Sequence, residues 1–282
     1  MQGKMKGYSE ILRRLLEDLQ RRGSLLVSFS GGVDSSVVAY LAYKALKDNS
    51  LAVTIKSPLT PSGEIEDAKK VAKEIGIKHL IVPFNELKIP GFNGNPPNRC
   101  YLCKKARFRF LKKLAAEKGF RTVADGTNLD DLKEYRPGNK ALKEEGIYSP
   151  LAAHGLGKRQ VREIASTIGL SVASKPSNTC LATRFPYGCS LDLESLRRVD
   201  LAEAYLKRKF ELKKLRVRSH GNLARIEISK DELEGFLERL REARKSLIAK
   251  FRRLGFTYIA LDLEGYRLGS FDVDILKADR NR

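Results

Sequence analysis

The chain has 282 residues, of which 42% are hydrophobic and 31% charged, which is typical of a globular protein with one large domain or two. No run approaches the roughly 18 consecutive apolar residues of a membrane-spanning helix, and the amino-terminal residues lead into a charged helical pattern, so we expect a cytoplasmic protein. The net charge of +20 should attract anions such as nucleotides, phosphorylated small molecules or RNA, although an ion-paired surface of a thermostable protein would explain it equally well.

The predicted elements alternate between strands and helices along the first half of the chain. After a predicted helix over residues 8–22, short apolar runs predict strands at residues 25–29, 51–55, 79–84 and 122–126. Helical periodicity between these runs predicts helices at residues 35–47, 63–75 and 100–118. This alternation favours an α/β fold with a parallel sheet, in which ligands bind beyond the carboxyl ends of the strands.

The first strand leads into the next helix through Ser-Gly-Gly-Val-Asp-Ser-Ser at residues 30–36. The glycines allow the backbone to approach an anion, which the N-terminus of the helix favours. Asp34 could hold a magnesium ion or cap the helix, and ordinary capping would also explain this composition. The string resembles the SGGxDS motif of the PP-loop ATP pyrophosphatases, which grips the pyrophosphate of ATP. The resemblance implies adenylylation, with ATP contacts at Ser28, Ser30, Gly31, Gly32, Val33, Asp34, Ser35 and Ser36.

Further polar residues follow the second and fourth predicted strands. Lys56 and Ser57 should border the adenine or the ribose, while Asp125, Gly126 and Thr127 should face the α-phosphate. Asp130 and Asp131 could help to hold magnesium or cap a helix. The charge-rich residues 128–146 are expected to form a surface loop.

The four cysteines occur in a chain without a secretory signal, which favours metal or reactive roles over structural disulfides. Cys100 and Cys103 open a helix that continues with several cations, where a thiol pKa is lowered, although a partly buried pair of small side chains would look the same. Cys180 follows a predicted helix at residues 158–168 and lies in a polar loop that includes Ser177 and Arg184.

These motifs together resemble the LarE family of PP-loop sulfur transferases, which act in the synthesis of the nickel-pincer nucleotide. The segments that carry the resemblance are NRCYLCK (98–104), ADGTNLDD (124–131), CLATRFPYG (180–188), RVRSHGNLARIEI (216–228) and LDLEGYRLGS (261–270). The resemblance implies that ATP adenylylates a carboxylate of pyridinium-3,5-biscarboxylic acid mononucleotide and that protein-bound sulfur then displaces AMP, which leaves a thiocarboxylate.

The resemblance leaves two sources of sulfur open. In one branch of the family the cysteine at the position of Cys180 gives up its sulfur and ends as dehydroalanine. In another branch three cysteines hold a [4Fe-4S] cluster with one open iron. We favour the cluster, on Cys100, Cys103 and Cys180, because a sacrificial Cys180 would leave the CxxC pair without a role. Cys189 is best explained as a packed side chain, with a spare thiol or a substitute ligand as alternatives.

A predicted helix at residues 192–209 and a following strand indicate a second, smaller α/β domain at residues 191–282, after a PP-loop domain at residues 1–190. Alternation along the strand places Arg216, Arg218 and His220 on one face, where two guanidiniums can clamp a phosphate, unless the strand is simply basic and exposed. The resemblance implies that this domain binds the phosphate of the substrate, with Arg267 as a further ligand, and that Glu203 binds magnesium.

Two other functions stay open at this point. The segment LGKRQVREIA and the CxxC pair also resemble the tRNA 2-thiouridylases, and the positive charge suits RNA, although the C-terminal part does not resemble their β-barrel modules. A nucleotide-binding regulator would not need reactive cysteines. The LarE resemblance further implies a homo-oligomer and transient contacts with the enzymes that carboxylate the substrate and insert nickel.

Overall fold

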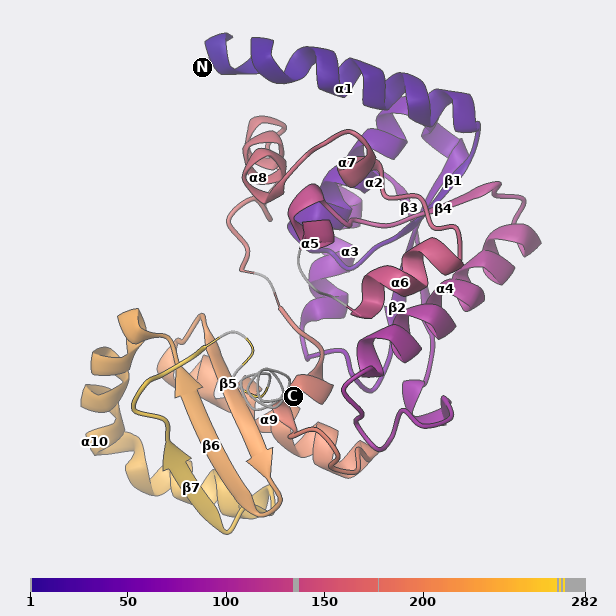
Figure 1. Ribbon diagram of the computed structural model, residues 1–282. Coiled ribbons are helices and arrows are strands. Elements are labelled where there is room, and N and C mark those ends of the chain that lie inside the picture. Colours follow the sequence, from indigo (N-terminus) through magenta and orange to yellow (C-terminus); the bar gives the residue numbers. More distant parts are fainter. Residues whose placement is uncertain (1, 134–136, 177, 268, 270, 272–282) are drawn as a thin grey trace, which may run out of the picture. The chain divides into compact units, whose positions relative to one another are not determined.

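The computed structural model describes residues 2–133, 137–176, 178–267, 269 and 271 (Figure 1). The chain forms two compact units. Unit 1 comprises Met1–Ser57, Gly63–Ile89 and Asn98–Asn178, and unit 2 comprises Pro58–Ser62, Pro90–Pro97 and Thr179–Arg282. The division after Asn178 lies earlier in the chain than the boundary expected from the sequence, and two short segments of the first half belong to the second unit.

Unit 1 is built on a parallel sheet with the strand order β3-β2-β1-β4. The strands are β1 (Leu25–Ser28), β2 (Ser50–Lys56), β3 (Lys78–Pro83) and β4 (Thr122–Ala124). They alternate with α2 (Val33–Leu46), α3 (Glu64–Ile75) and α4 (Arg99–Glu117), and α1 (Gln2–Arg22) precedes them. The α/β fold and the parallel sheet predicted from the sequence are confirmed.

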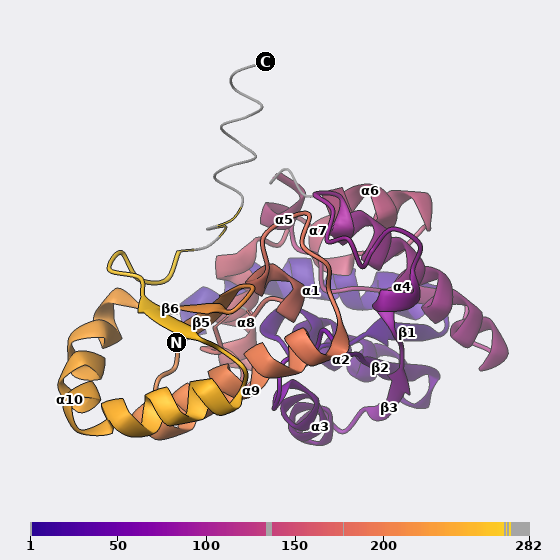
Figure 2. The same cartoon turned by 90° about the horizontal axis from the view of Figure 1, so that it is seen from below.

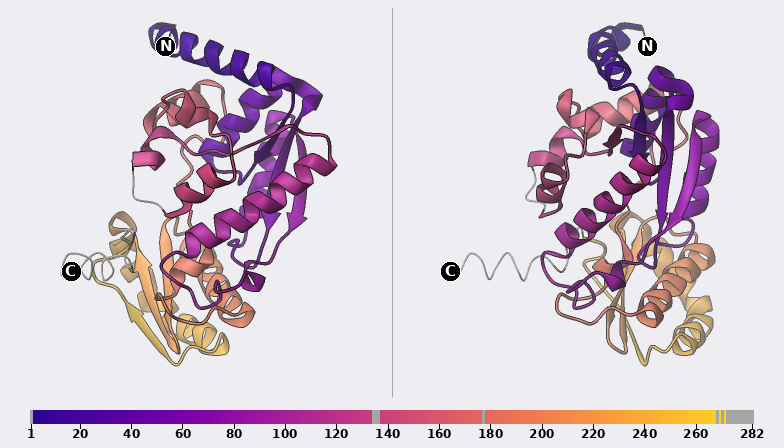
Figure 3. Two further views of the ribbon diagram at one scale, coloured as in Figure 1. Left: turned by 45° about the vertical axis from the view of Figure 1, so that its right-hand side comes forward. Right: turned by 90° about the vertical axis from the view of Figure 1, so that its right-hand side faces the viewer.

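The two faces of this sheet bury different side chains. Leu25 and Val27 of β1 pack in one core with apolar side chains of α1, α2 and α3. Leu26 of β1 and Val53 of β2 belong to a second core, which also includes Leu111 of α4. Helix α4 crosses one face of the sheet (Figure 3). Buried strands with apolar side chains on both faces are expected in a parallel sheet that is covered by helices on both sides.

Residues 128–146 do not form the surface loop that their charge suggested. The structure places α5 (Leu129–Lys133) and α6 (Pro137–Glu144) there, and residues 134–136 of the expected loop lie outside the described residues. Proline suits the first position of a helix, and Ala141 and Leu142 of α6 are buried. Tertiary burial of this short apolar face therefore outweighs the charge-rich composition. Two further helices, α7 (Pro150–Ala153) and α8 (Lys158–Thr167), complete unit 1.

Unit 2 contains a three-stranded sheet with the order β5-β6-β7. β5 (Leu215–His220) and β6 (Leu223–Ile228) are antiparallel, and β7 (Tyr258–Leu261) runs parallel to β6. Two long helices, α9 (Leu193–Phe210) and α10 (Lys230–Arg253), lie together along one face of this sheet (Figure 2). The rings of Phe210 and Phe236 meet between these helices at a centroid distance of 4.8 Å. The smaller C-terminal α/β unit expected from the sequence is confirmed.

Within the described part of the chain, no helix combines the length and the apolar composition that a membrane crossing requires.

Candidate functional site

The loop between β1 and α2 is organised by its own hydroxyl groups. Ser30 Oγ lies 3.1 Å from Ser35 Oγ and accepts a hydrogen bond from the Gly32 N–H at 3.3 Å. Ser35 Oγ and Ser36 Oγ donate to the Gly32 carbonyl at 3.1 and 2.8 Å. These contacts tie Ser30 and Gly32 to the first turn of α2, and Ser28 lies just before them at the end of β1.

Several backbone N–H groups of this turn remain available. Those of Gly31, Val33, Asp34 and Ser35 donate to no other residue in the described ranges. The first N–H groups of a helix, together with the helix dipole, form a binding site for anions. Gly31 has a φ of 69°, and a Cβ on it would lie 2.7 Å from Ala68 Cα, so both the turn and its packing against α3 require glycine.

Asp34 is fixed through both of its carboxylate oxygens. Oδ1 accepts a hydrogen bond from Asn128 Nδ2 at 3.3 Å, and Oδ2 forms an ion pair with the ammonium of Lys158. Neither Asn128 nor Lys158 was expected from the sequence to contact this loop. A signal for Lys158 did exist: it is the first residue of α8, where the helix dipole disfavours a cation and a nearby anion would offset this effect.

The residues after β4 are engaged mainly with one another. The carboxylate of Asp125 accepts hydrogen bonds from Thr127 Oγ1 at 2.5 Å and from Ser149 Oγ at 2.6 Å. Gly126 lies against the first turn of α2, and a Cβ on it would be 2.7 Å from the Ser35 N atom. Gly126 is therefore adjacent to the loop of residues 30–36, while the Asp125 carboxylate shapes the turn that contains Thr127.

Asp130 and Asp131, for which the sequence left magnesium binding or helix capping open, both contact backbone donors. Asp130 Oδ2 accepts the Lys158 N–H at 2.8 Å, and Asp131 Oδ2 accepts the Asn128 N–H at 3.2 Å. These contacts favour capping.

The CxxC pair lies at the start of α4, with Cys100 exposed and Cys103 half-buried. Arg107 follows on the same helix face, because residues i, i+3 and i+7 share one face. Its guanidinium donates to the buried Glu86 at 2.6 Å and to Ser57 Oγ at 3.3 Å. Ser57 directly follows β2, so the helix face that carries the thiols is directed toward the carboxyl end of β2. Lys56, which the sequence assigned to the nucleotide pocket, is the exposed last residue of this strand.

Cys180 belongs to unit 2 and directly precedes the short 3₁₀ turn η3 (Leu181–Arg184). Its carbonyl accepts hydrogen bonds from Thr183 Oγ1 at 2.9 Å and from Arg184 Nη1 at 3.2 Å. The next N–H, that of Leu181, donates to the Leu59 carbonyl at 2.9 Å. The backbone of the half-buried Cys180 is therefore fixed on both sides. The half-buried Cys189 follows η3, and its N–H donates to the Pro186 carbonyl at 3.3 Å.

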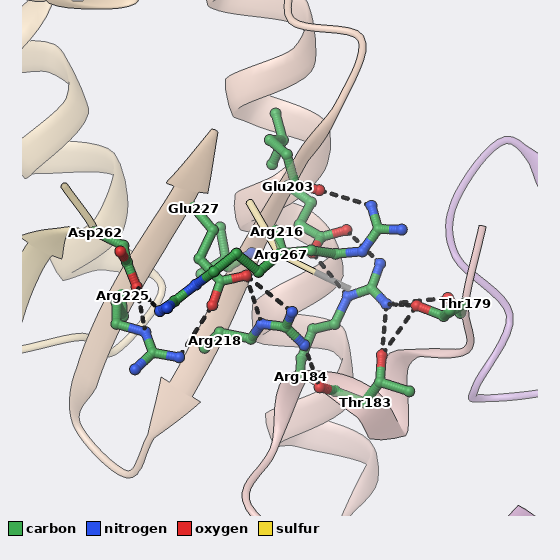
Figure 4. A network of polar contacts seen from close by, with 12 residues as sticks. Thr179, Thr183, Arg184, Glu203, Arg216, Arg218, Arg225, Glu227, Asp262 and Arg267 are labelled. Atoms are coloured by element: carbon green, nitrogen blue, oxygen red, sulfur yellow. Dashed lines mark hydrogen bonds and ion pairs between the residues drawn. The ribbon is translucent and has the colours of Figure 1, made fainter. Parts of the chain in front are cut away.

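Arg184 joins the Cys180 turn to α9 and has no exposed surface (Figure 4). Its Nε and Nη2 donate to the two oxygens of Glu203 at 2.8 and 3.0 Å, and Nη1 donates to the Thr179 carbonyl at 3.0 Å. Burial alone would raise the pKa of Glu203, but the charge of Arg184 outweighs it and holds this pKa below its usual value. Glu203 also accepts the Val217 N–H at 3.0 Å, so its contacts are those of a counter-ion and not of the magnesium ligand predicted from the sequence.

The two arginines of β5 are buried, and the alternative of an exposed basic strand is wrong. Arg218 donates to Glu227 at 2.9 Å and to the Thr183 carbonyl at 2.6 Å. Among the described residues, Arg216 donates to the adjacent Leu215 carbonyl alone, and burial and then the charge of Arg184 lower its pKa. Arg216 therefore contributes a guanidinium without a carboxylate partner among the described residues (Figure 4).

The remaining predicted residues of unit 2 are Arg267 and His220, the last residue of β5. Arg267 is half exposed and pairs with Glu264 at 2.6 Å and with Asp262 at 3.8 Å. His220 packs edge-on against Phe271, and burial and then Arg225 lower its pKa. Leu268 and Ser270 of the predicted C-terminal motif and Ser177 of the cysteine loop lie outside the described residues. Among the described residues no three His, Cys, Asp or Glu side chains gather as a metal site within the structure.

Comparison with known proteins gives some matches over nearly the whole chain and others over only part of it. A family model described as NAD synthase matches residues 6–128. An uncharacterized protein of Synechocystis sp. is 43% identical over 263 residues, which cover 93% of this chain and 96% of the relative. Pyridinium-3,5-bisthiocarboxylic acid mononucleotide synthase of Lactiplantibacillus plantarum is 35% identical over 264 residues, 93% of either chain. The tRNA-specific 2-thiouridylase MnmA of Rickettsia felis is 31% identical over a shorter region, which covers 56% of this chain and 53% of the relative.

Proposed function

This chain belongs to the family of pyridinium-3,5-bisthiocarboxylic acid mononucleotide synthase, the LarE sulfur transferases, and we propose that it acts on the corresponding dicarboxylate, pyridinium-3,5-biscarboxylic acid mononucleotide. The chain is a PP-loop enzyme that uses ATP to transfer sulfur. The observation that carries the proposal is the row of available N–H groups at the start of α2, which suits the pyrophosphate of ATP, in a chain that aligns with this synthase over nearly all of its length.

The proposed reaction has two steps. An oxygen of the substrate carboxylate attacks the α-phosphorus of ATP, and the bond to pyrophosphate breaks, which gives an acyl-adenylate. A sulfur nucleophile then attacks the acyl carbon and AMP leaves, which gives the thiocarboxylate. The donors of residues 30–36 would stabilise the charge on the departing pyrophosphate. Ser28, Lys56, Gly126 and Thr127 would line the rest of the nucleotide site.

Arg216, Arg218 and Arg267 would bind the phosphate of the substrate. Arg184, Arg216 and Arg218 bring three positive charges to a place where Glu203 and Glu227 bring two negative ones, so this cluster retains a positive charge. Arg216 is the strongest candidate because its guanidinium contacts no carboxylate of the described residues. Buried arginine is well suited to hold a phosphate through paired hydrogen bonds.

The sulfur centre would consist of Cys100, Cys103 and Cys180. Two thiols on one face of α4 fit two ligands of a [4Fe-4S] cluster, and Cys180 on its fixed turn would supply the third. Such a cluster would carry an additional sulfide for transfer. Without a cluster, Cys180 Sγ itself would attack the acyl-adenylate. Loss of the Cα proton and cleavage of the Cβ–Sγ bond would then leave dehydroalanine in the chain and the sulfur on the product.

Magnesium would be held by Asp34 together with the phosphates of ATP, since carboxylate oxygen is a suitable ligand for this ion. Asp34 is partly exposed and lies in the same turn as the available N–H groups. Glu203 does not fit this role, because Arg184 and Val217 use its oxygens.

The test is release of pyrophosphate from ATP that depends on the dicarboxylate substrate, followed by detection of the thiocarboxylate product. The protein is purified without oxygen and assayed for iron, sulfide and visible absorption, and its mass is measured after turnover. A brown protein with intact Cys180 supports the cluster, whereas a colourless chain lighter by the mass of H₂S supports the sacrificial cysteine. Cys180→Ser should abolish product formation, and Cys189→Ser is the matched control because Cys189 is also half-buried beside η3.

Transfer of sulfur to tRNA is the second candidate, and it is favoured by the partial match to MnmA. It predicts salt-sensitive binding of tRNA and formation of thiouridine. If these products appeared and the dicarboxylate were not consumed, the first proposal would be wrong. In the first proposal the enzyme is a cytoplasmic homo-oligomer that meets the substrate-carboxylating and nickel-inserting enzymes only transiently.

A further inference from the structure

A lysine from another part of the chain contacts the PP-loop, and neither the SGGVDSS motif nor the reaction proposed above gives this lysine a role. Lys158 forms an ion pair with the Asp34 carboxylate, although the two residues are far apart in the sequence. The side chains are 32% and 22% exposed, so the pair lies at the edge of the site and solvent can reach it. A positive charge thus lies beside the N–H groups that the loop presents.

The position of Lys158 is set by its backbone and not by the ion pair alone. Its N–H donates to Asp130 Oδ2 at 2.8 Å. The preceding Gly157 is packed so closely that a Cβ would lie 2.7 Å from the same oxygen. Gln160 Oε1 accepts the Gly157 N–H at 2.8 Å. The start of α8 is therefore anchored on the segment after β4 by contacts that do not involve the lysine ammonium.

An ion pair is not required to keep Asp34 in place. Asp34 lies in the first turn of α2, where the helix dipole already stabilises a carboxylate, and Asn128 Nδ2 donates to its other oxygen. Lys158 itself lies at the first position of α8, where the dipole of that helix opposes a positive charge. The placement costs stability in α8, and a second anionic partner would explain it.

We propose that Lys158 is the cationic contact of the ATP pyrophosphate, and that its ammonium exchanges the Asp34 carboxylate for phosphate oxygens when the nucleotide binds. This inference rests on the proposed use of ATP at the PP-loop. The exchange keeps Lys158 paired and releases Asp34 for the cation that accompanies ATP. Because the loop holds the pyrophosphate part, Lys158 contributes to binding of ATP and pyrophosphate and not to binding of AMP.

The test compares the affinities of the full chain for ATP, inorganic pyrophosphate and AMP by titration calorimetry. Lys158→Gln should weaken binding of ATP and pyrophosphate by about tenfold or more, the loss expected for one charged hydrogen bond, and leave AMP within about twofold. Lys158→Arg should lose less. Arg159→Gln is the matched control, since it removes an equal charge from the exposed next residue of the same helix turn.

Two outcomes would overturn the role of Lys158: equal affinities of Lys158→Gln and Arg159→Gln, or an equal loss for all three ligands. A double-mutant cycle of Lys158→Gln and Asp34→Asn distinguishes direct contact between Lys158 and the phosphates from an indirect effect, in which Lys158 only neutralises the charge of Asp34. Direct contact requires that Lys158→Gln still weakens pyrophosphate binding in the Asp34→Asn background, and no loss there overturns the inference. If the unmodified protein bound neither ATP nor pyrophosphate, the proposed function itself would fail.

Discussion

Arg184 shows how one buried side chain can link the reactive turn to the scaffold. Its guanidinium contacts Glu203 on one side and the carbonyls of Thr179 and Cys180 on the other. Burying both charges is costly, and the arrangement is tolerated because each of the three guanidinium nitrogens donates to an acceptor. Movement of the Cys180 backbone would break several charged hydrogen bonds at once, so Arg184 positions the thiol.

Glu203→Gln should strongly destabilise the protein, because it leaves the guanidinium of Arg184 buried without an opposite charge. The expected loss is about 3–5 kcal/mol in the free energy of unfolding, measured by urea denaturation. Glu17→Gln breaks an exposed ion pair with Arg13 and should cost less than about 1 kcal/mol. Equal losses for the two variants would contradict the role assigned to the buried pair.

His79 should make stability depend on pH. Its Nε2–H donates to Thr54 Oγ1 at 2.8 Å, since the Thr54 hydroxyl donates to the Phe29 carbonyl. Burial and then the charge of Lys69 lower the pKa of His79. The unfolded chain therefore binds more protons below about pH 6.5, and the free energy of unfolding decreases as the pH falls toward 5.

The measurement for His79 is urea denaturation at a series of pH values between about 5 and 8. His79→Gln should give a shallower decrease on the acid side. His220, whose pKa is also lowered, should account for part of the remaining slope. An unchanged slope in His79→Gln would show that the ring is protonated equally in the folded and unfolded chain.

Among the elements, the first turn of α2 depends on close packing by glycine. Gly126→Ala would place a Cβ 2.7 Å from the Ser35 N atom and 3.0 Å from Ser35 Cα, both of which are backbone. The turn must shift, which should cost about 1–3 kcal/mol in stability and weaken ATP binding.

The matched control for Gly126 is Gly235→Ala in α10. A Cβ at Gly235 would meet only the flexible Arg239 side chain at 3.7 Å, and alanine favours a helix over glycine. This variant should be more stable by about 0.5–1 kcal/mol and should bind ATP normally. Unchanged ATP affinity in Gly126→Ala would show that the turn tolerates displacement.

The helices and strands were largely predictable because their apolar periodicity is strong. Strand β1, helix α3 and helix α9 lie within a residue or two of the ranges expected from the sequence. The helices within residues 128–146 were not predictable, because the burial of Leu142 is a tertiary effect that composition does not reveal. The pairing of Lys158 with Asp34 and of Arg184 with Glu203 joins distant segments, and a single sequence carries no record of such contacts.

At the scale of the molecule, unit 2 is assembled from three separate segments of the chain. The Leu59 carbonyl accepts the Leu181 N–H, and Asn95 Nδ2 donates to the Phe185 and Pro186 carbonyls at 3.2 and 2.8 Å. Local sequence patterns could not foresee this division, because residues 58–62 and 90–97 lie among the elements of unit 1.

A fragment of residues 179–282 should fold incompletely, since it lacks these hydrogen-bond partners. Hydrogen exchange followed by mass spectrometry should find rapid exchange over residues 181–191 in the fragment and slow exchange there in the full chain, while β5 and β6 stay protected in both. Slow exchange over residues 181–191 in the fragment would contradict the structural role of the two borrowed segments.

The same interleaving limits how this enzyme can be recombined with its relatives. A chimera joined at residue 178 would combine a Cys180 turn from one parent with its supporting loops from the other. Functional hybrids should therefore be those in which residues 58–62, 90–97 and 179–282 all come from the same parent. These three segments, and not a single junction, define the part that can be exchanged.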